Sequence, residues 1–158
     1  MSRNRGFTLI ELVIVIAILG VLAGVITPSF MAWRDRSKVK GDATELRAVF
    51  ESAKLRAIKH NANAVVTFPD TTSYQAFVDS NGNGIRDAGE VIIASITLSP
   101  GVTITNNTFS GNKMAFDSRG NADVPTGSTG SLVTMTSPGG ARYNVSVTSF
   151  GRVQMRRL

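Results

Sequence analysis

The feature that most constrains this chain is an uncharged stretch near its N-terminus, from Leu12 to Trp33. Roughly 20 such residues in a helix rise about 30 Å, which is the thickness of the hydrocarbon core of a bilayer. Val and Ile are frequent in the stretch and would also suit a buried strand, but such a strand usually has only about 4 to 8 residues. The stretch therefore predicts a helix that can span a membrane.

A secretory signal peptide is the alternative, because Arg3 and Arg5 form a basic segment before the apolar run. The run lacks the small-x-small cleavage pattern of such a peptide, and it carries Glu11 at its edge. An acid there is costly and is usually functional, so we expect Glu11 to find a cationic partner. If the chain is cut after Gly6, the new α-amine of Phe7 in a neighbouring copy can be that cation.

The chain carries the sequence GFTLIE at residues 6–11, directly before the apolar run. This motif resembles the class III leader of type IV pilins and type II secretion pseudopilins. The resemblance implies cleavage between Gly6 and Phe7 by a membrane prepilin peptidase, N-methylation of Phe7, and polymerisation with other pilins through the N-terminal helix. It gives Glu11 and Pro28 roles in assembly, since proline removes one helical hydrogen bond and softens the stem.

Length and composition leave room for one further domain. The 158 residues, less a leader at 1–6 and a membrane-spanning helix at 7–33, allow a domain of about 100 residues with a modest core. The chain has no cysteine, so it has neither disulfides nor thiolate zinc sites. Its formal net charge of +6 falls by two when Arg3 and Arg5 leave with the leader, and the remaining positive charge favours anionic partners such as DNA or lipid headgroups.

Residues 34–61 predict an amphipathic helix that continues the stem and ends near Lys59 to Asn61. Small and apolar residues recur there three or four positions apart, which places them on one helix face. The residues on this face are Val39, Ala43, Leu46, Phe50, Ala53 and Ala57.

Residues 62–158 predict a β-rich domain of short strands separated by Gly, Asn, Asp, Ser and Pro. Residues 121–130 form a polar loop within it. With the long helix laid on antiparallel sheet, the expected fold class is α+β and pilin-like. The candidate strands are Val65–Phe68, Tyr74–Val78, Val91–Leu98, Val102–Thr105, Lys113–Asp117, Leu132–Thr136 and Tyr143–Thr148.

The sequence SFGRV at residues 149–153, after a Gly-rich turn at 138–140, resembles the C-terminal segment of the GspH/FimT branch of minor pilins and pseudopilins. The resemblance implies a minor type IV pilin that enters or primes a filament. Before assembly it would be a single-pass inner-membrane protein with a periplasmic or extracytoplasmic domain, and after assembly it would be part of a pilus or pseudopilus. Two alternatives stay open: an H-type minor pseudopilin of a type II secretion system, and a nucleic-acid receptor module carried on a pilin stem.

Residues 79–90 follow the spacing D-x-N-x-N-G-x5-E of a calcium-binding loop. Two Asn-Gly pairs in the same segment also predict a hairpin turn, and Asp and Asn side chains stabilise turns without any metal. Calcium is the one cofactor that the sequence suggests, and the turn is the alternative. The metal ligands would be Asp79, Asn81, Asn83, the carbonyl of Ile85, Asp87 and Glu90.

The tail at residues 151–158 carries three arginines, Arg152, Arg156 and Arg157. Strand-like spacing places Arg152 and Arg156 on one face, opposite Val153 and Met155. Arginine binds phosphate bidentately and stays charged, so the tail predicts a DNA-backbone clamp, with a solvated end or a subunit contact as the alternative. The resemblance supports DNA, because FimT-like pilins linked to natural transformation bind it through such a segment.

Catalysis is not expected. The single histidine, His60, follows a basic helix end, and the sequence shows no Ser-His-acid order, phosphate loop or paired-carboxylate cleft. We therefore expect a structural or binding protein without enzymatic activity.

Overall fold

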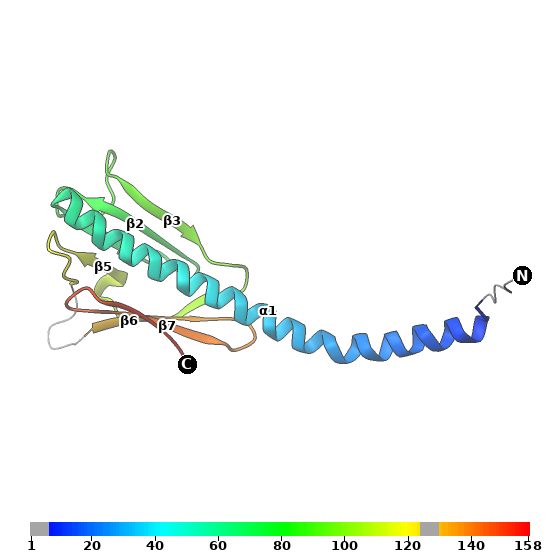
Figure 1. The fold of residues 1–158 in the computed structure, drawn as a ribbon. Helices are drawn as coiled ribbons and strands as arrows, with labels where there is room; N and C mark the ends of the chain where they lie inside the picture. The colour runs from blue at the N-terminus through cyan, green and yellow to red at the C-terminus, as the bar shows by residue number, and fades with distance from the viewer. Residues whose placement is uncertain (1–6, 124–129) are drawn as a thin grey trace, which may run out of the picture. The chain divides into compact units, whose positions relative to one another are not determined.

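The computed structural model describes residues 7–123 and 130–158, and the predicted leader at 1–6 and most of the polar loop lie outside them. The chain divides into two compact units, Met1–Arg34 and Asp35–Leu158. Figure 1 shows the order of the elements in the described residues. They are the helix α1 (Leu9–His60), the strands β1 (Asn63–Thr67), β2 (Ser73–Asp79), β3 (Ile92–Thr97) and β4 (Thr103–Asn107), the 3-10 turn η1 (Ser110–Asn112), and the strands β5 (Lys113–Phe116), β6 (Gly130–Thr136), β7 (Arg142–Thr148) and β8 (Val153–Arg157).

Local sequence signals set both ends of α1. At the start, the Thr8 hydroxyl accepts a hydrogen bond from the Glu11 N–H at 3.3 Å, and the Glu11 carboxylate accepts one from the Thr8 N–H at 2.8 Å. This reciprocal pair is a capping box. At the end, Asn61 adopts a φ of 48°, and the Ala62 N–H donates to the Ala57 carbonyl, which closes a Schellman motif.

In the unit Met1–Arg34, α1 carries its apolar side chains on the outside. The segment is long and apolar enough to cross a membrane by length and composition. Leu9 is 79% exposed and Leu19 is 57% exposed, although both are strongly apolar. These side chains lack the burial that stabilises a globular core. Their exposure to water is therefore unfavourable unless lipid or another protein surface covers them.

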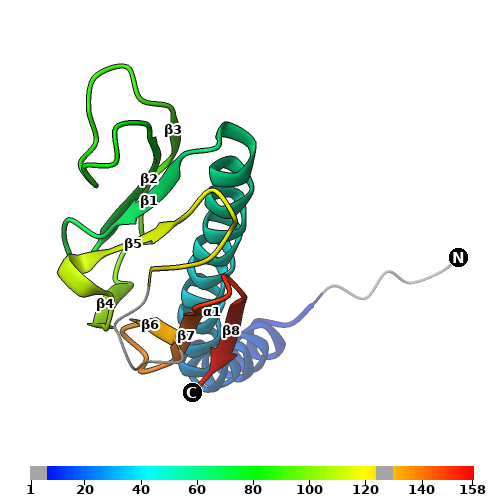
Figure 2. The ribbon, with the colours of Figure 1, turned by 90° about the vertical axis from the view of Figure 1, so that its left-hand side faces the viewer.

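In the unit Asp35–Leu158, the strands form two antiparallel four-stranded sheets. The first sheet has the order β3-β2-β1-β5 and the second has the order β4-β6-β7-β8. Figures 1 and 2 show the C-terminal part of α1 beside the strands of both sheets. The α+β, pilin-like fold class predicted from the sequence is confirmed.

The core lies between α1 and the inner faces of both sheets. Every residue of the predicted helix face, from Val39 to Ala57, is fully buried there. Phe50 lies at the centre, with its ring centroid 5.8 Å from that of Phe109 and 6.4 Å from that of Phe116 in edge-on contacts. Each such aromatic pair contributes about 0.5–1.5 kcal/mol beyond the area it buries.

A buried carboxylate ties α1 to the turn after β3. Asp42 is 7% exposed and accepts hydrogen bonds from the Ser99 N–H at 3.0 Å and the Ser99 hydroxyl at 2.8 Å. Buried polar groups are tolerated when they are hydrogen-bonded in this way. The contact fixes the helix against the turn between β3 and β4, where the chain passes from the first sheet to the second.

Candidate functional site

The first predicted site is the beginning of the stem. Phe7 is 88% exposed, and its predicted cleavage partner Gly6 lies outside the described residues. The Glu11 carboxylate accepts two hydrogen bonds within its own chain, from the Thr8 N–H at 2.8 Å and the Thr8 hydroxyl at 2.9 Å. The spacing T-x-x-E predicts these hydrogen bonds, and our sequence reasoning missed it. Glu11 is thus partly satisfied before any neighbour arrives.

Pro28 lies inside α1, which runs from Leu9 to His60 as one helix. A proline inside a helix removes one backbone hydrogen bond wherever it occurs. Its predicted role in assembly stays a prediction.

The second predicted site is the C-terminal tail, and it forms β8 at the edge of the second sheet. Val153 is buried and Met155 half-buried, whereas Arg152, Gln154 and Arg156 are exposed, so the predicted alternation is present. Arg157 is also exposed, but its position in the strand places it on the face of Val153 and Met155. The structure therefore brings Arg152 and Arg156 to one face and separates Arg157 from them.

The register of β7 and β8 adds a fourth arginine. Arg156 pairs with Asn144, which places Arg142 two residues further along β7 on the same face. Arg142 is exposed. Sequence reasoning missed this residue, because only the pairing of β7 with β8 across the turn at residues 149–152 shows that it faces the same way. We call Arg142, Arg152 and Arg156 the arginine face.

The third predicted site, the loop at residues 79–90, is closed by its own hydrogen bonds. Asp79 is 2% exposed, and its carboxylate accepts the N–H groups of Gly82 and Gly84, each at 2.7 Å. The Glu90 carboxylate accepts the N–H groups of Ser80 at 2.9 Å and Asp87 at 3.0 Å. Two of the predicted ligand groups thus serve as acceptors for the backbone of the turn.

The remaining loop side chains also bond to one another. The amides of Asn81 and Asn83 both donate to Asp87 at 2.7 Å, and these bonds lower the pKa of the Asp87 carboxyl below its usual value. The Asn83 side-chain oxygen accepts the N–H of Ile85 at 2.7 Å. Within residues 7–123 and 130–158, no group of three or more His, Cys, Asp or Glu side chains is arranged to hold a metal ion.

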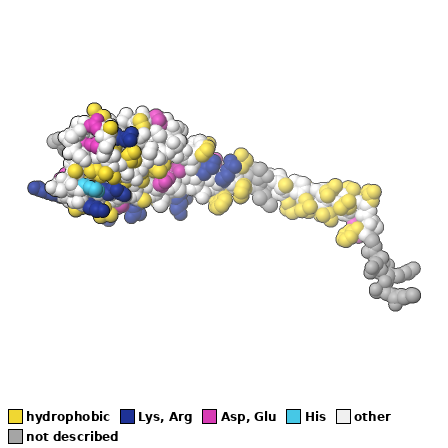
Figure 3. Space-filling model, turned by 90° about the horizontal axis from the view of Figure 1, so that it is seen from above, with side chains coloured by type: hydrophobic (Ala, Val, Ile, Leu, Met, Phe, Trp, Pro, Cys, Tyr) yellow, Lys and Arg dark blue, Asp and Glu magenta, His cyan; other side chains and the backbone are white. Residues whose placement is uncertain are grey.

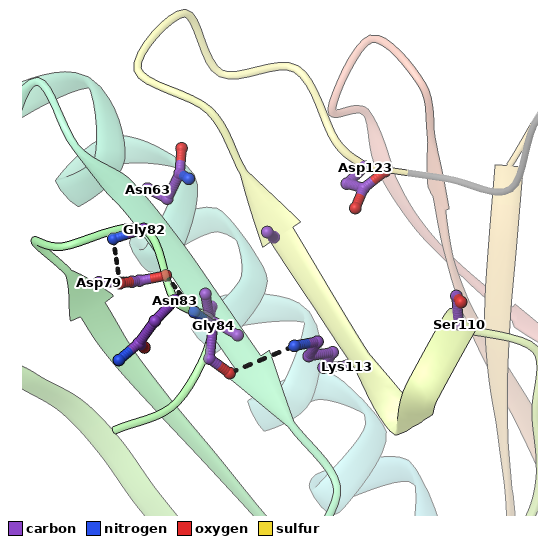
Figure 4. A pocket seen from close by; sticks show the side chains of 10 residues that line it. Asn63, Asp79, Gly82, Asn83, Gly84, Ser110, Lys113 and Asp123 are labelled. Atoms are coloured by element: carbon purple, nitrogen blue, oxygen red, sulfur yellow. Dashed lines mark hydrogen bonds between the residues drawn. The ribbon is translucent and has the colours of Figure 1, made fainter. Parts of the chain in front are cut away.

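The loop borders a polar hollow of about 500 Å³ on the outer face of the first sheet. Figure 4 shows Asn63, Asp79 and Lys113 around it, with Asp123 on the far side. The Lys113 ammonium lies 3.5 Å from the Gly84 carbonyl oxygen and so spans from β5 to the loop.

His60 is exposed at the end of α1, as expected for a helix C-terminal residue.

Two family models match the chain. The model described as "Type II transport protein GspH" matches residues 42–151. The model described as "Prokaryotic N-terminal methylation motif" matches residues 1–27. Together they cover both the stem motif and the C-terminal segment that the sequence singled out.

The similar proteins differ in how much of this chain they match. The pilin-like protein PilA1 of Thermus thermophilus is 31% identical over 163 residues, covering 96% of this chain and 98% of that protein. The type IV major pilin protein PilA of Myxococcus xanthus is 50% identical over 52 residues, covering 33% of this chain and 24% of that protein. The type II secretion system core protein G of Klebsiella pneumoniae is 45% identical over 58 residues, covering 35% of this chain and 41% of that protein.

Two solved structures are similar to the fold. The minor pseudopilin EpsH from the type 2 secretion system of Vibrio cholerae superposes with a TM-score of 0.58 at 12% identity, covering 76% of this chain and 97% of that one. The type IV minor pilin FimU of Pseudomonas aeruginosa superposes with a TM-score of 0.59 at 15% identity, covering 78% of this chain and 92% of that one. At these identities the likeness concerns the fold alone.

Proposed function

The chain belongs to the GspH-type family of minor pilins and pseudopilins, which serve type IV pili or type II secretion, and from this premise we propose that it is a minor subunit of a type IV pilus. In this proposal a prepilin peptidase cuts before Phe7, the new amine is methylated, and the subunit waits in the inner membrane until it enters or primes a filament. The match to the N-terminal methylation motif supports the processing step.

The observation that carries the proposal is the exposed apolar surface of the stem. Its side chains are uncovered in the single chain, with Leu12 59% and Ile16 57% exposed. Lipid covers such a surface before assembly, and the stems of neighbouring subunits cover it in a filament. The same helix can thus serve as membrane anchor and polymerisation element.

The full-length relative favours a pilus over a secretion machine. PilA1 of Thermus thermophilus, named a pilin-like protein, matches nearly all of this chain, whereas the Klebsiella pneumoniae secretion protein matches about a third of it. The alternative, an H-type minor pseudopilin, is supported by the family description and the fold of EpsH. Deleting the gene and measuring twitching, protein secretion and DNA uptake in parallel separates them, because loss of secretion alone would identify the pseudopilin.

Glu11 provides the test of assembly. Thr8 donates to the Glu11 carboxylate, and a neighbouring Phe7 amine would add the charge that offsets its cost in lipid. We expect Glu11→Val to insert into the membrane at least as well as the parent and to enter sheared filaments poorly. Thr8→Ser, which keeps both donors, is the matched control. Normal incorporation of Glu11→Val would remove the pairing from the proposal.

A second function, DNA binding, is favoured by the arginine face. Arg152 directly precedes β8 and Arg156 lies within it. Four residues of extended chain span about 13 Å, and this matches about four base steps along a duplex. Arg142 lies beside Arg156 on the neighbouring strand, so the face is two strands wide. Guanidinium groups in this arrangement can contact phosphates spaced along a duplex without reading the sequence.

Titration of labelled duplex DNA with the full chain in detergent micelles tests this second function. Each Arg→Gln change at 142, 152 or 156 should weaken binding uniformly across sequences and flatten the log–log salt slope by about 0.9. Arg157→Gln removes the same charge from the opposite face and should have the smaller effect. A triple variant with Gln at positions 142, 152 and 156 that matches the parent in affinity and salt slope would contradict this second function. The protein would then be a structural minor pilin that does not bind DNA.

A further inference from the structure

We propose that Phe150 stacks on an unpaired nucleobase, so that the turn between β7 and β8 gives the arginine face a preference for single-stranded or frayed DNA. This inference rests on the DNA binding proposed above and adds a residue and a substrate class to it. Phe150 is 82% exposed, which is far outside the core occupied by most other phenylalanines of this unit. Exposed aromatic rings beside cations are the arrangement with which proteins hold single strands.

The turn that carries Phe150 is fixed by hydrogen bonds on both sides of the ring. The Thr148 N–H donates to the Arg152 carbonyl at 3.0 Å, and the Gly151 N–H donates to the Thr148 carbonyl at 2.8 Å. The Thr148 hydroxyl accepts the Arg152 N–H at 3.2 Å. The ring is therefore presented by an ordered backbone, and its exposure does not come from a loose loop. A preorganised aromatic group loses little conformational entropy on binding.

A second turn and α1 support this one from behind. The Lys54 ammonium donates to the Gly151 carbonyl at 3.0 Å, and the Ala122 N–H donates to the Ser149 carbonyl at 2.9 Å. Gly151 has a φ of 68°, and a Cβ at this position would overlap the carbonyl oxygen of Gly120. Only glycine allows this close approach, which brings the turn at residues 117–121 against the Phe150 turn.

The two packed turns each carry or border an exposed arginine. Arg119 is exposed in the second turn, and Arg152 is exposed two residues after Phe150. The carboxylate of the second turn, Asp117, is directed to its own backbone, because it accepts the N–H groups of Arg119 at 2.9 Å and Asn121 at 2.8 Å. Figure 3 shows further Lys and Arg side chains gathered near His60, at the end of α1. In this inference the phosphates next to a stacked base would contact Arg119 and Arg152.

Phe150, Arg152 and Arg156 follow one another along the chain from the turn into β8. Phe150 directly precedes the Gly151–Arg152 step into β8, and Arg156 lies four residues beyond Arg152. A strand of DNA whose phosphates follow Arg156 and Arg152 therefore reaches the ring with its next base. A paired base is already stacked within the duplex, so only an unpaired base gains from this contact.

Fluorescence anisotropy with the full chain in detergent micelles tests the inference. The probes are a labelled single-stranded oligothymidine and a closed hairpin duplex of the same charge. We expect Phe150→Ala to weaken binding of the single strand roughly 5- to 150-fold, which corresponds to the loss of one stacked base. The hairpin should change by less than about 2-fold. Phe150→Tyr should retain single-strand binding, and Leu55→Ala, at another exposed apolar side chain of the same unit, should change neither.

Three outcomes would overturn the inference, and they differ from a failure of DNA binding itself. Equal losses for both probes, or no loss for the single strand, show that Phe150 does not stack on a base while the arginine face still binds. Unchanged single-strand affinity together with poor entry of Phe150→Ala into filaments shows that the ring contacts a neighbouring subunit instead. A parent chain that binds neither probe removes the DNA proposal as a whole. Unchanged thermal unfolding of Phe150→Ala confirms that the turn remains folded.

Discussion

At the scale of single residues, Tyr74 carries a buried hydroxyl without a hydrogen-bond partner in the described part of the chain. Within residues 7–123 and 130–158, its hydroxyl is the only buried side-chain nitrogen or oxygen that makes no hydrogen bond. Burial raises the pKa of the phenol well above its usual value, and the nearby Glu45 and Asp42 carboxylates add to the shift. The ring itself fits the core and packs 6.1 Å from that of Phe68. No sequence pattern shows an orphaned hydroxyl, because it depends on the packing of three separate segments.

We predict that Tyr74→Phe keeps or increases stability. An unsatisfied buried hydroxyl costs about 1–3 kcal/mol, and its removal leaves the ring contacts unchanged. A gain of 1 kcal/mol would raise the melting temperature by roughly 4–8 °C for a domain of this size. Calorimetry of the full chain in detergent measures the change. A loss above about 1 kcal/mol would show that the hydroxyl holds a bound water, and Phe68→Leu serves as the packing control.

Asp70 gives the molecule a specific sensitivity to acid. Its carboxylate accepts hydrogen bonds from the Ser73 hydroxyl at 2.6 Å, the Thr72 hydroxyl at 2.7 Å and the Thr72 N–H at 2.6 Å. Hydrogen bonds of this kind favour the charged form, and they lower the pKa of Asp70 from 3.8 to about 2. The group is exposed, so solvent moderates its effect on overall stability.

Because the folded state lowers this pKa, the contribution of Asp70 to stability is present above the unfolded value. We predict that it is lost as the pH falls from about 4 towards about 2. Asp70→Asn should flatten the fall in melting temperature over that interval, with little effect at pH 7 beyond the lost hydrogen bonds. NMR titration of the Asp70 carboxyl gives the direct measurement. A midpoint near 3.8 would contradict the hydrogen-bonded arrangement.

At the scale of elements, sequence reasoning succeeded where the signal is local. Periodicity predicted the buried face of α1, and short β-type runs between turn residues predicted strands that overlap β1 to β7, because these signals repeat within a few residues. The division into two sheets could not be predicted, since it depends on β4 pairing with β6 and not with β5, which follows it in the chain. The arginine face was found in part for the same reason. Arg152 directly precedes β8 and Arg156 lies within it, whereas Arg142 joins them only through the register of two strands.

The loop at residues 79–90 fits two interpretations, a calcium-binding loop and a turn. Its spacing fits a calcium loop, but Asp79 and Glu90 are engaged by the backbone of the turn itself. We predict that Asp79→Ala destabilises the unit Asp35–Leu158 by about 1–3 kcal/mol, because two N–H groups lose their acceptor. Thermal unfolding measures this, with Asn81→Ser as a milder control in the same loop.

Calcium distinguishes the two interpretations of this loop. We expect the parent chain to hold the turn without an ion, since its carboxylates already have donors. A rise in melting temperature with millimolar Ca²⁺, abolished by Asp79→Ala with Glu90→Ala, would show that an ion binds the folded state and replaces those donors. An equal melting temperature with Ca²⁺ and with chelator would show that the segment is a turn.

At the scale of the whole molecule, the proposed function assigns assembly to one unit and DNA binding to the other. The unit Met1–Arg34 carries exposed apolar side chains and the capped Glu11, and the unit Asp35–Leu158 carries the core and the arginine face. Composition separated these units, because an uncharged run longer than any strand cannot be buried in so small a domain.

The central claim is that the mature subunit begins at Phe7 and polymerises through its stem. The most direct measurement is mass spectrometry of the N-terminal peptide from protein extracted from membranes and from sheared filaments. The account predicts an N-methylated Phe7 at the N-terminus in both fractions, with residues 1–6 absent. Gly6→Leu, which should block the peptidase, is the control and should leave an intact Met1 in the membrane only. A parent chain that retains Met1, or that is cut beyond Ala23 as a signal peptide would be, contradicts the account.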